Sequence, residues 1–145
     1  MIQHYEYKIR KKKLPLTGRQ TPRAARDAEE LSGTVHGFRA SDLEERFAKA
    51  LDLKDIEYYF RFALGERGMP GWRELDFLVV FFGYHPIEVE DITFIHRGKT
   101  SEDAWKDAQV MEALKEYQPF PVVHITNDDL YDQDAANATV RRLFG

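Results

Sequence analysis

Closely spaced carboxylates mark the segment with the clearest potential for chemistry. The stretch PIEVEDITFIH contains Glu88, Glu90 and Asp91, and Asp76 precedes them within the apolar run ELDFLVVFF. Two carboxylates about 4 Å apart repel by roughly 4 kcal/mol at an effective dielectric constant near 20. Either a bound cation or solvent must offset this repulsion, and hard cations such as Mg²⁺ prefer oxygen ligands. The chain has no cysteine, so a metal site would use oxygen and imidazole ligands.

Three successive strands are expected to position these acids. Alternation of side-chain type predicts the first strand, and the second is nearly all apolar past Asp76, which is typical of a central strand covered on both faces. Residues two apart on a strand share a face, so Glu88 and Glu90 point the same way and can converge with Asp76. The alternative is that Glu88 and Glu90 lie on the solvated face of an edge strand. The predicted strands cover about residues 56–62, with Tyr58, Phe60 and Phe62 on one face, 74–82 and 86–91.

Helices and a fourth strand complete the predicted domain. Ser41 and Glu44 match the S-x-x-E pattern of a capping box, which predicts the start of a helix. Apolar residues recurring at intervals of three and four predict two more helices, and FPVVHIT predicts a strand. The helices cover about residues 41–51, 100–116 and 133–144, and the strand covers 120–126. In the second helix the spacing assigns to the inward face Ala104, Trp105, Ala108, Met111 and Leu114.

This order of elements predicts the fold class. Three consecutive strands joined by short turns indicate an antiparallel meander, and the later strand, helix, strand crossover adds a parallel pairing. The prediction is an α/β (α+β) domain over residues 41–145, with the order helix, three strands, helix, strand and a C-terminal helix. Helices would cover the faces of a mixed sheet.

The beginning of the chain differs from the rest in charge. Residues 1–26 contain eight Lys or Arg and one acid, whereas the whole chain has 21 basic and 25 acidic residues and a net charge of −4. This pattern predicts a basic, partly extended arm over residues 1–40, attached to an acidic body. The run Lys11, Lys12 and Lys13 is typical of phosphate contact, and a solubilising or subunit-docking arm is the alternative.

The sequence also bears on location and assembly. No stretch approaches the ~18 consecutive apolar residues of a membrane span, and the N-terminus lacks the apolar core of a secretory signal. We therefore expect a cytoplasmic protein with no membrane partner. A homodimer is compatible with the sequence, although no residue demands one.

The acidic residues and the order of elements together resemble a known family, the restriction-endonuclease-like nucleases of the PD-(D/E)XK superfamily. The family signature is an Asp followed by Glu-x-Lys on the next strand, and here Asp76 is followed by Glu88, Val89 and Glu90. The resemblance covers roughly residues 41–126, and it implies the restriction-endonuclease-like core.

The segment that follows is similar to one branch of this family. HRGKTSEDAWKDAQVMEAL looks like the continuation in the branch that contains the very short patch repair endonuclease. In that branch a histidine follows the third strand, and a polar helix with paired basic and acidic residues comes next. The matching positions are His96, Lys106 and Asp107.

The resemblance implies roles for individual residues. Asp76 would be the central metal ligand and Glu88 the second, while Glu44 would approach the metal from the first helix. Glu44 has an alternative role, because the fourth residue of a capping box can simply bond the backbone N–H of Ser41. His96 would act as the acid/base or water-orienting group.

The sequence departs from the signature at Glu90, where the family usually has lysine. That lysine would orient the attacking water and offset negative charge on the phosphate, and a carboxylate does neither in the same way. Lys99 or Lys106 could supply the missing positive charge from another part of the chain. His124, on the apolar fourth strand, is interpreted as structural.

The function implied by the resemblance is a Mg²⁺ (or Mn²⁺) dependent endonuclease that hydrolyses DNA phosphodiester bonds. Asp76, Glu88, Glu90 and His96 would form the catalytic group. The alternative is a catalytically inactive nuclease-fold protein with a nucleic-acid-binding or phage assembly role. The Glu90 departure and the acidic body favour this alternative.

Overall fold

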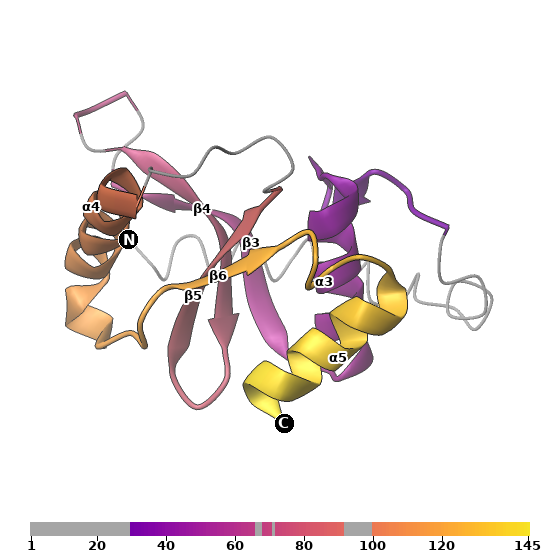
Figure 1. The fold of residues 1–145 in the computed structure, drawn as a ribbon. Helices are drawn as coiled ribbons and strands as arrows, with labels where there is room; N and C mark the ends of the chain where they lie inside the picture. Colours follow the sequence, from indigo (N-terminus) through magenta and orange to yellow (C-terminus); the bar gives the residue numbers. More distant parts are fainter. Residues whose placement is uncertain (1–29, 66–67, 71, 92–99) are drawn as a thin grey trace.

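A four-stranded mixed sheet with helices on both faces forms the centre of the protein (Figure 1). The computed structural model describes residues 30–65, 68–70, 72–91 and 100–145. The helices and strands in this part of the chain are β1 (Thr34–Val35), β2 (Phe38–Arg39), α3 (Asp42–Leu53), β3 (Glu57–Leu64), β4 (Arg73–Val80), β5 (Tyr84–Glu90), α4 (Thr100–Ala113), a 3₁₀ turn (Lys115–Tyr117), β6 (Val123–Thr126) and α5 (Gln133–Phe144).

The sheet has the pairing that the sequence predicts. Its strand order is β3-β4-β5-β6, in which β3, β4 and β5 are antiparallel and β5 pairs with β6 in parallel. Helices α3 and α5 lie on one side of the sheet and α4 lies on the other (Figure 1). The α+β class, the meander and the parallel crossover are therefore confirmed.

Helix α3 begins with the predicted capping box. The Ser41 side chain accepts a hydrogen bond from the Glu44 backbone N–H at 3.1 Å, and the Glu44 carboxylate accepts one from the Ser41 N–H at 2.9 Å. These bonds satisfy two of the N–H groups that every helix start leaves without an intrahelical partner. The apolar face of α3, which includes Phe47 and Leu51, packs into the core beside α5.

The alternation predicted for the first strand breaks at Arg61. Phe60 packs in the cluster under α3 and α5, but Phe62 packs in the cluster under α4. Arg61 lies between them with a φ of 57°, in the left-handed region that a non-glycine residue rarely adopts. This turn of the backbone moves the following side chains to the other face, so the prediction that Tyr58, Phe60 and Phe62 share a face is wrong.

Strand β4 is the central strand that its apolar sequence predicts, with both core clusters packed on its faces. It ends at Val80 and not at residue 82, because Phe82 belongs to the turn into β5. Phe82 has a φ of 52° and is 90% exposed. The next residue must be glycine, since a Cβ at Gly83 would lie 2.7 Å from the ring of Phe120 and its φ is 132°.

The predicted inward face of the helix over 100–116 is wrong in its first half. Ala104, Trp105 and Ala108 are exposed, whereas Val110 and Leu114 are buried against the sheet. One turn earlier on that inward face stands Asp107, whose carboxylate contacts a strand residue. Apolar periodicity cannot detect a helix face whose inward position is a charged residue.

Strand β6 and helix α5 complete the core. The strand covers only Val123–Thr126 of the predicted 120–126, while α5 begins and ends where predicted. Asp132 caps α5, because its side chain accepts a hydrogen bond from the Ala135 N–H at 2.8 Å. No helix among the residues that the structure describes is long and apolar enough to cross a membrane.

A buried carboxylate attaches the β1–β2 hairpin to α3. Glu45 is only 6% exposed, and its two oxygens accept hydrogen bonds from the Ser32 N–H at 2.8 Å, the Ser32 hydroxyl at 2.8 Å and the Gly33 N–H at 2.7 Å. Val35 and Ala40, which follow these donors in the sequence, are buried in the core. The packed part of the chain therefore includes the hairpin before α3.

We expect the substitution Glu45→Ala to lower the free energy of unfolding by about 3 kcal/mol, because it leaves several donors without their charged acceptor. Chemical denaturation followed by circular dichroism measures this change. Glu112→Ala is the matched control, since the Glu112–Lys115 ion pair is exposed to water and contributes little to stability. Equal stability of the Glu45 and Glu112 variants would contradict the anchoring role.

Candidate functional site

Asp76 and Glu88 meet where the hydrogen-bonded ladder between β4 and β5 ends. The last bonded pair is Phe77 with Ile87, and continuing this register places Asp76 opposite Glu88. The Asp76 carboxylate accepts a hydrogen bond from the Val89 N–H at 2.9 Å, which takes the place of a ladder bond. The two carboxyl groups also hydrogen-bond to each other. The structure thus brings together the first two residues of the predicted site.

The two carboxyl groups change each other's protonation. Burial, then the charge of Asp76 and the hydrogen bond between the groups, raises the pKa of Glu88 to about 9. Burial also raises the pKa of Asp76, although its hydrogen bonds with Val89 and Glu88 oppose this shift. Near neutral pH Glu88 therefore keeps its proton and donates it in a hydrogen bond to Asp76. Among the described residues, neither group forms an ion pair with a basic side chain.

Glu44 approaches the pair from the other side of the sheet. Burial raises the pKa of Glu44, and the negative charge of Asp76 adds to the rise against the hydrogen bonds with Ser41. Asp76 lies opposite Arg61, where β3 and β4 change which face their side chains use. That irregularity explains how one carboxylate can act on a residue of α3 and on Glu88 of β5. Glu44 therefore both caps α3 and lies within electrostatic range of the predicted site.

Glu90 engages a histidine and not the pair. The Nδ1 atom of His124 contacts the Glu90 carboxylate, and its Nε2 atom lies 2.8 Å from the Asp107 carboxylate of α4. Burial lowers the pKa of His124, but the hydrogen bonds with Asp107 and Glu90 outweigh it and raise the pKa above its ordinary value. A ring with a carboxylate at each nitrogen is best satisfied when both nitrogens carry protons. The His124 ring therefore lies between the carboxyl groups of Glu90 and Asp107, which favour its protonated form.

The register of the parallel strands explains this arrangement. Glu88 pairs with His124 and Glu90 with Thr126, so the two glutamates and the imidazole share the face of the sheet that α4 covers. From the sequence alone, the otherwise apolar strand predicts a structural role for His124. One signal could have identified His124 as part of the acidic cluster. It is a polar residue inside an apolar strand, and this strand pairs with the strand that contains Glu88 and Glu90.

Several predicted residues lie elsewhere. His96 and Lys99, like the basic run Lys11–Lys13, fall outside the described residues. Lys106 is exposed on α4. The predicted catalytic and metal-binding residues that the structure describes, Glu44, Asp76, Glu88 and Glu90, are therefore all acidic.

The carboxylate oxygens of Asp76 and Glu88 could supply some of the ligands of a hard divalent cation. No three His, Asp or Glu side chains of the described chain are grouped closely enough to hold a metal by themselves. Asp76 and Glu88 nevertheless present adjacent carboxylate oxygens, and one or two carboxylates completed by water and substrate phosphate make an ordinary Mg²⁺ site. The proton that they share is one that a cation could replace. The pair therefore fits a divalent ion, while Glu44 is bonded to the helix cap.

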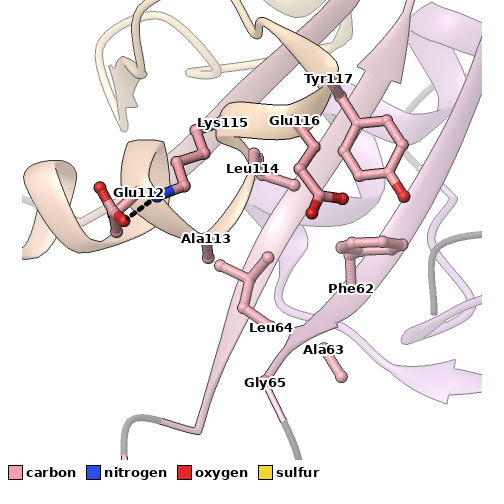
Figure 2. Close-up of a pocket in the computed structure, with 10 residues that line it drawn as sticks. All are labelled: Phe62, Ala63, Leu64, Gly65, Glu112, Ala113, Leu114, Lys115, Glu116 and Tyr117. Carbon is pink, nitrogen blue, oxygen red and sulfur yellow. Dashed lines mark hydrogen bonds and ion pairs between the residues drawn. The ribbon is translucent and has the colours of Figure 1, made fainter.

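A separate pocket lies away from these residues. It has a volume of about 240 Å³ and is lined by residues 62–65 at the end of β3 and residues 112–117 after α4. Figure 2 shows Lys115 turned toward Glu112, with which it forms an exposed ion pair at 2.7 Å. None of the predicted site residues lines this pocket, and its only charged pair is exposed to water. The acidic pair, and not the pocket, is the better candidate for chemistry.

Comparison of the chain with protein-family models, curated proteins and solved structures found no match. The α+β architecture rests on the structure itself. A functional assignment therefore rests on the geometry of the acidic pair and of His124.

The substitution Glu88→Gln should change how stability depends on pH. Because folding raises the pKa of Glu88, its stabilising effect is complete below pH 4.5 and is lost as pH rises through about 9. The slope of the unfolding free energy contributed by Glu88 is at most about 1.4 kcal/mol per pH unit. Thermal melts between pH 5 and 9 should show the variant gaining stability relative to the parent as pH rises. A constant difference would contradict the shared-proton arrangement.

His124 should remain protonated above the pH at which an ordinary imidazole loses its proton. Nuclear magnetic resonance titration of the histidine side chains measures this, with His124→Asn identifying the signal among five histidines. Asp107→Asn removes one charged acceptor and should lower the pKa of His124. If the titration of His124 is the same in the parent and in the Asp107 variant, the two-carboxylate arrangement is wrong.

Proposed function

We propose that the protein is a metal-dependent endonuclease that hydrolyses DNA phosphodiester bonds at the Asp76–Glu88 pair. One observation carries this proposal: two half-buried carboxyl groups from adjacent strands share a hydrogen bond, with no basic side chain of the described chain paired to either. Buried carboxylates without a cation are costly, and such groups cluster at functional sites. The order of elements and the Asp then Glu-x-Glu spacing resemble the PD-(D/E)XK nucleases and support the same assignment.

The chain's own groups have distinct parts in this proposal. Asp76 and Glu88 would hold Mg²⁺ or Mn²⁺, which supplies polarisation of a phosphate oxygen and a lower pKa for bound water. The Val89 N–H fixes the orientation of the Asp76 carboxylate. Glu44 adds negative charge on the α3 side, which strengthens attraction for a cation. His124, oriented by Glu90 and Asp107, places a positive charge on the same face as Glu88.

His124 could replace the positive charge of the signature lysine, whose position is occupied by Glu90 in this chain. A lysine at that position would add positive charge beside the phosphate, whereas Glu90 binds an imidazole that carries the charge instead. Histidine can also exchange protons near neutral pH, which lysine does less readily. In this proposal Glu90 positions the protonated ring of His124 and does not itself contact the metal.

DNA is the proposed partner because of the charge distribution. The acidic body repels nucleic acid unless a cation bridges it, and the basic residues concentrate in 1–26. Binding would then depend both on divalent ions and on the basic segment with Lys11–Lys13. The homodimer and the cytoplasmic location stay predictions from the sequence.

The second candidate is a nuclease-fold protein that binds nucleic acid without cleaving it. The observation that favours it is the engagement of Glu90 with His124, which leaves the Asp76–Glu88 pair without a lysine from the third signature position. Binding of DNA with no strand cleavage in Mg²⁺ or Mn²⁺ would support this candidate over the endonuclease.

The decisive test is nicking of supercoiled and branched DNA in Mg²⁺ or Mn²⁺. We expect the parent to nick, and Asp76→Asn to lose about a hundredfold or more in rate, because Asn keeps an acceptor for the Val89 N–H but not the charge. Glu112→Gln, at an exposed site away from the pair, should keep the parent rate. Equal nicking by the parent and the Asp76 variant would indicate a contaminating nuclease and overturn the proposal.

A further inference from the structure

Trp105 is the most unusual side chain near the acidic site. It is 58% exposed on the first half of α4, although sequence periodicity assigns it to the core. Large aromatic side chains dominate cores and interfaces, so an exposed tryptophan gives up much of the area it could bury. Its neighbour in sequence, Lys106, is also exposed. The first turns of α4 therefore present an indole and an ammonium group side by side in the chain.

A guanidinium group completes this surface. The Arg73 side chain, at the start of β4, lies over the Trp105 ring with its central carbon 5.8 Å from the ring centroid. The Arg73 Nε atom is buried and has no hydrogen-bond acceptor among the described residues. A guanidinium group binds phosphate through its terminal nitrogens, and the buried Nε atom would take no part in that contact. Trp105 and Arg73 together thus offer an aromatic face beside a donor for phosphate.

Strand β4 connects this surface to the acidic pair, because it contains both Arg73 and Asp76. The start of β4 and the first turns of α4 are together at the upper left of Figure 1. Arg73 precedes Asp76 by three residues on β4, which is roughly 10 Å along a strand. Stacked nucleotides rise by about 3.4 Å each along one strand, so this distance spans about three of them.

We propose that Trp105 and Arg73 form a stacking site for an unpaired DNA base, within about three nucleotides of the phosphate that the Asp76–Glu88 pair would cleave. This inference rests on the proposed function for the identity of the nucleic acid. Indole rings stack on bases of any type, and a guanidinium group adds a cation–π contact and a phosphate contact. A base in a duplex already has both faces covered by its neighbours. The site therefore selects single-stranded or locally unpaired DNA over a continuous duplex.

Fluorescence titration tests this without any cleavage. The chain has two tryptophans, so Trp72→Phe leaves Trp105 as the only indole. In buffer with a chelator, an oligothymidylate of about 15 nucleotides should quench its emission in a saturable way, and the matched blunt duplex should bind more weakly. If Trp72→Phe does not fold, anisotropy of labelled DNA with the otherwise unmodified chain gives the same affinities.

The variants separate stacking from a general structural effect. Trp105→Ala should weaken binding of the single strand by about tenfold, whereas Trp105→Phe should stay within about threefold of the parent. Arg73→Gln should weaken binding and lower the salt dependence by about 0.7 in log–log slope, as expected for one phosphate contact on a single strand. Phe82→Ala is the matched control, because it removes an exposed aromatic ring from the turn between β4 and β5.

The outcomes distinguish this inference from the proposed function. Unchanged affinity of Trp105→Ala for the single strand, or equal affinity of the parent for single strand and duplex, would overturn the stacking site even if the protein nicks DNA. Weakened binding by Trp105→Ala together with no nicking by the parent would support the stacking site and overturn the endonuclease. Asp76→Asn should bind the single strand at least as tightly as the parent, since it removes one negative charge.

Discussion

Two carboxyl groups that must share one proton or one cation are the constraint on which the site depends. Asp76 and Glu88 come from neighbouring strands, lie half-buried, and hydrogen-bond to each other where the β4–β5 ladder stops. If both ionised without a partner, repulsion and desolvation would oppose folding. The fold therefore keeps two mutually repelling acids close together, and in the proposed function a divalent ion would offset that repulsion.

The backbone around this pair departs from regular sheet geometry. The ladder stops at Phe77 and Ile87, and the Val89 N–H bonds the Asp76 carboxylate where a strand partner would otherwise be. Arg61, opposite Asp76, has a left-handed backbone that reverses the side-chain faces of β3. These irregularities occur beside the acidic pair, in the middle of an otherwise regular sheet. Departures of this kind are common at functional sites.

The sequence predicted the elements whose signals are local. The capping box of Ser41 and Glu44, the helix over 133–144 and the antiparallel meander follow from short-range rules, and the structure confirms them. The pairing of Asp76 with Glu88 was also predictable, because strand periodicity and one short turn fix their relative position.

The features that the sequence could not reveal depend on contacts between distant residues. The face reversal at Arg61 involves a non-glycine residue at positive φ, for which no sequence pattern exists. The inward face of α4 could not be assigned from apolar spacing, because the charged residue Asp107 lies on it. Asp107 contacts His124, and His124 in turn contacts Glu90. Its three residues come from β5, β6 and α4, so the cluster can be recognised only when the register of the parallel strands is known.

Calorimetric titration of Mn²⁺ into the protein, in two buffers of different ionisation enthalpy at pH 7.5, tests the central claim most directly. If a cation replaces the proton shared by Asp76 and Glu88, binding should release about one proton per ion, and the observed heat should differ between the buffers accordingly. Glu88→Gln should remove this release. The absence of Mn²⁺ binding, or binding with the same heat in both buffers, would contradict the account.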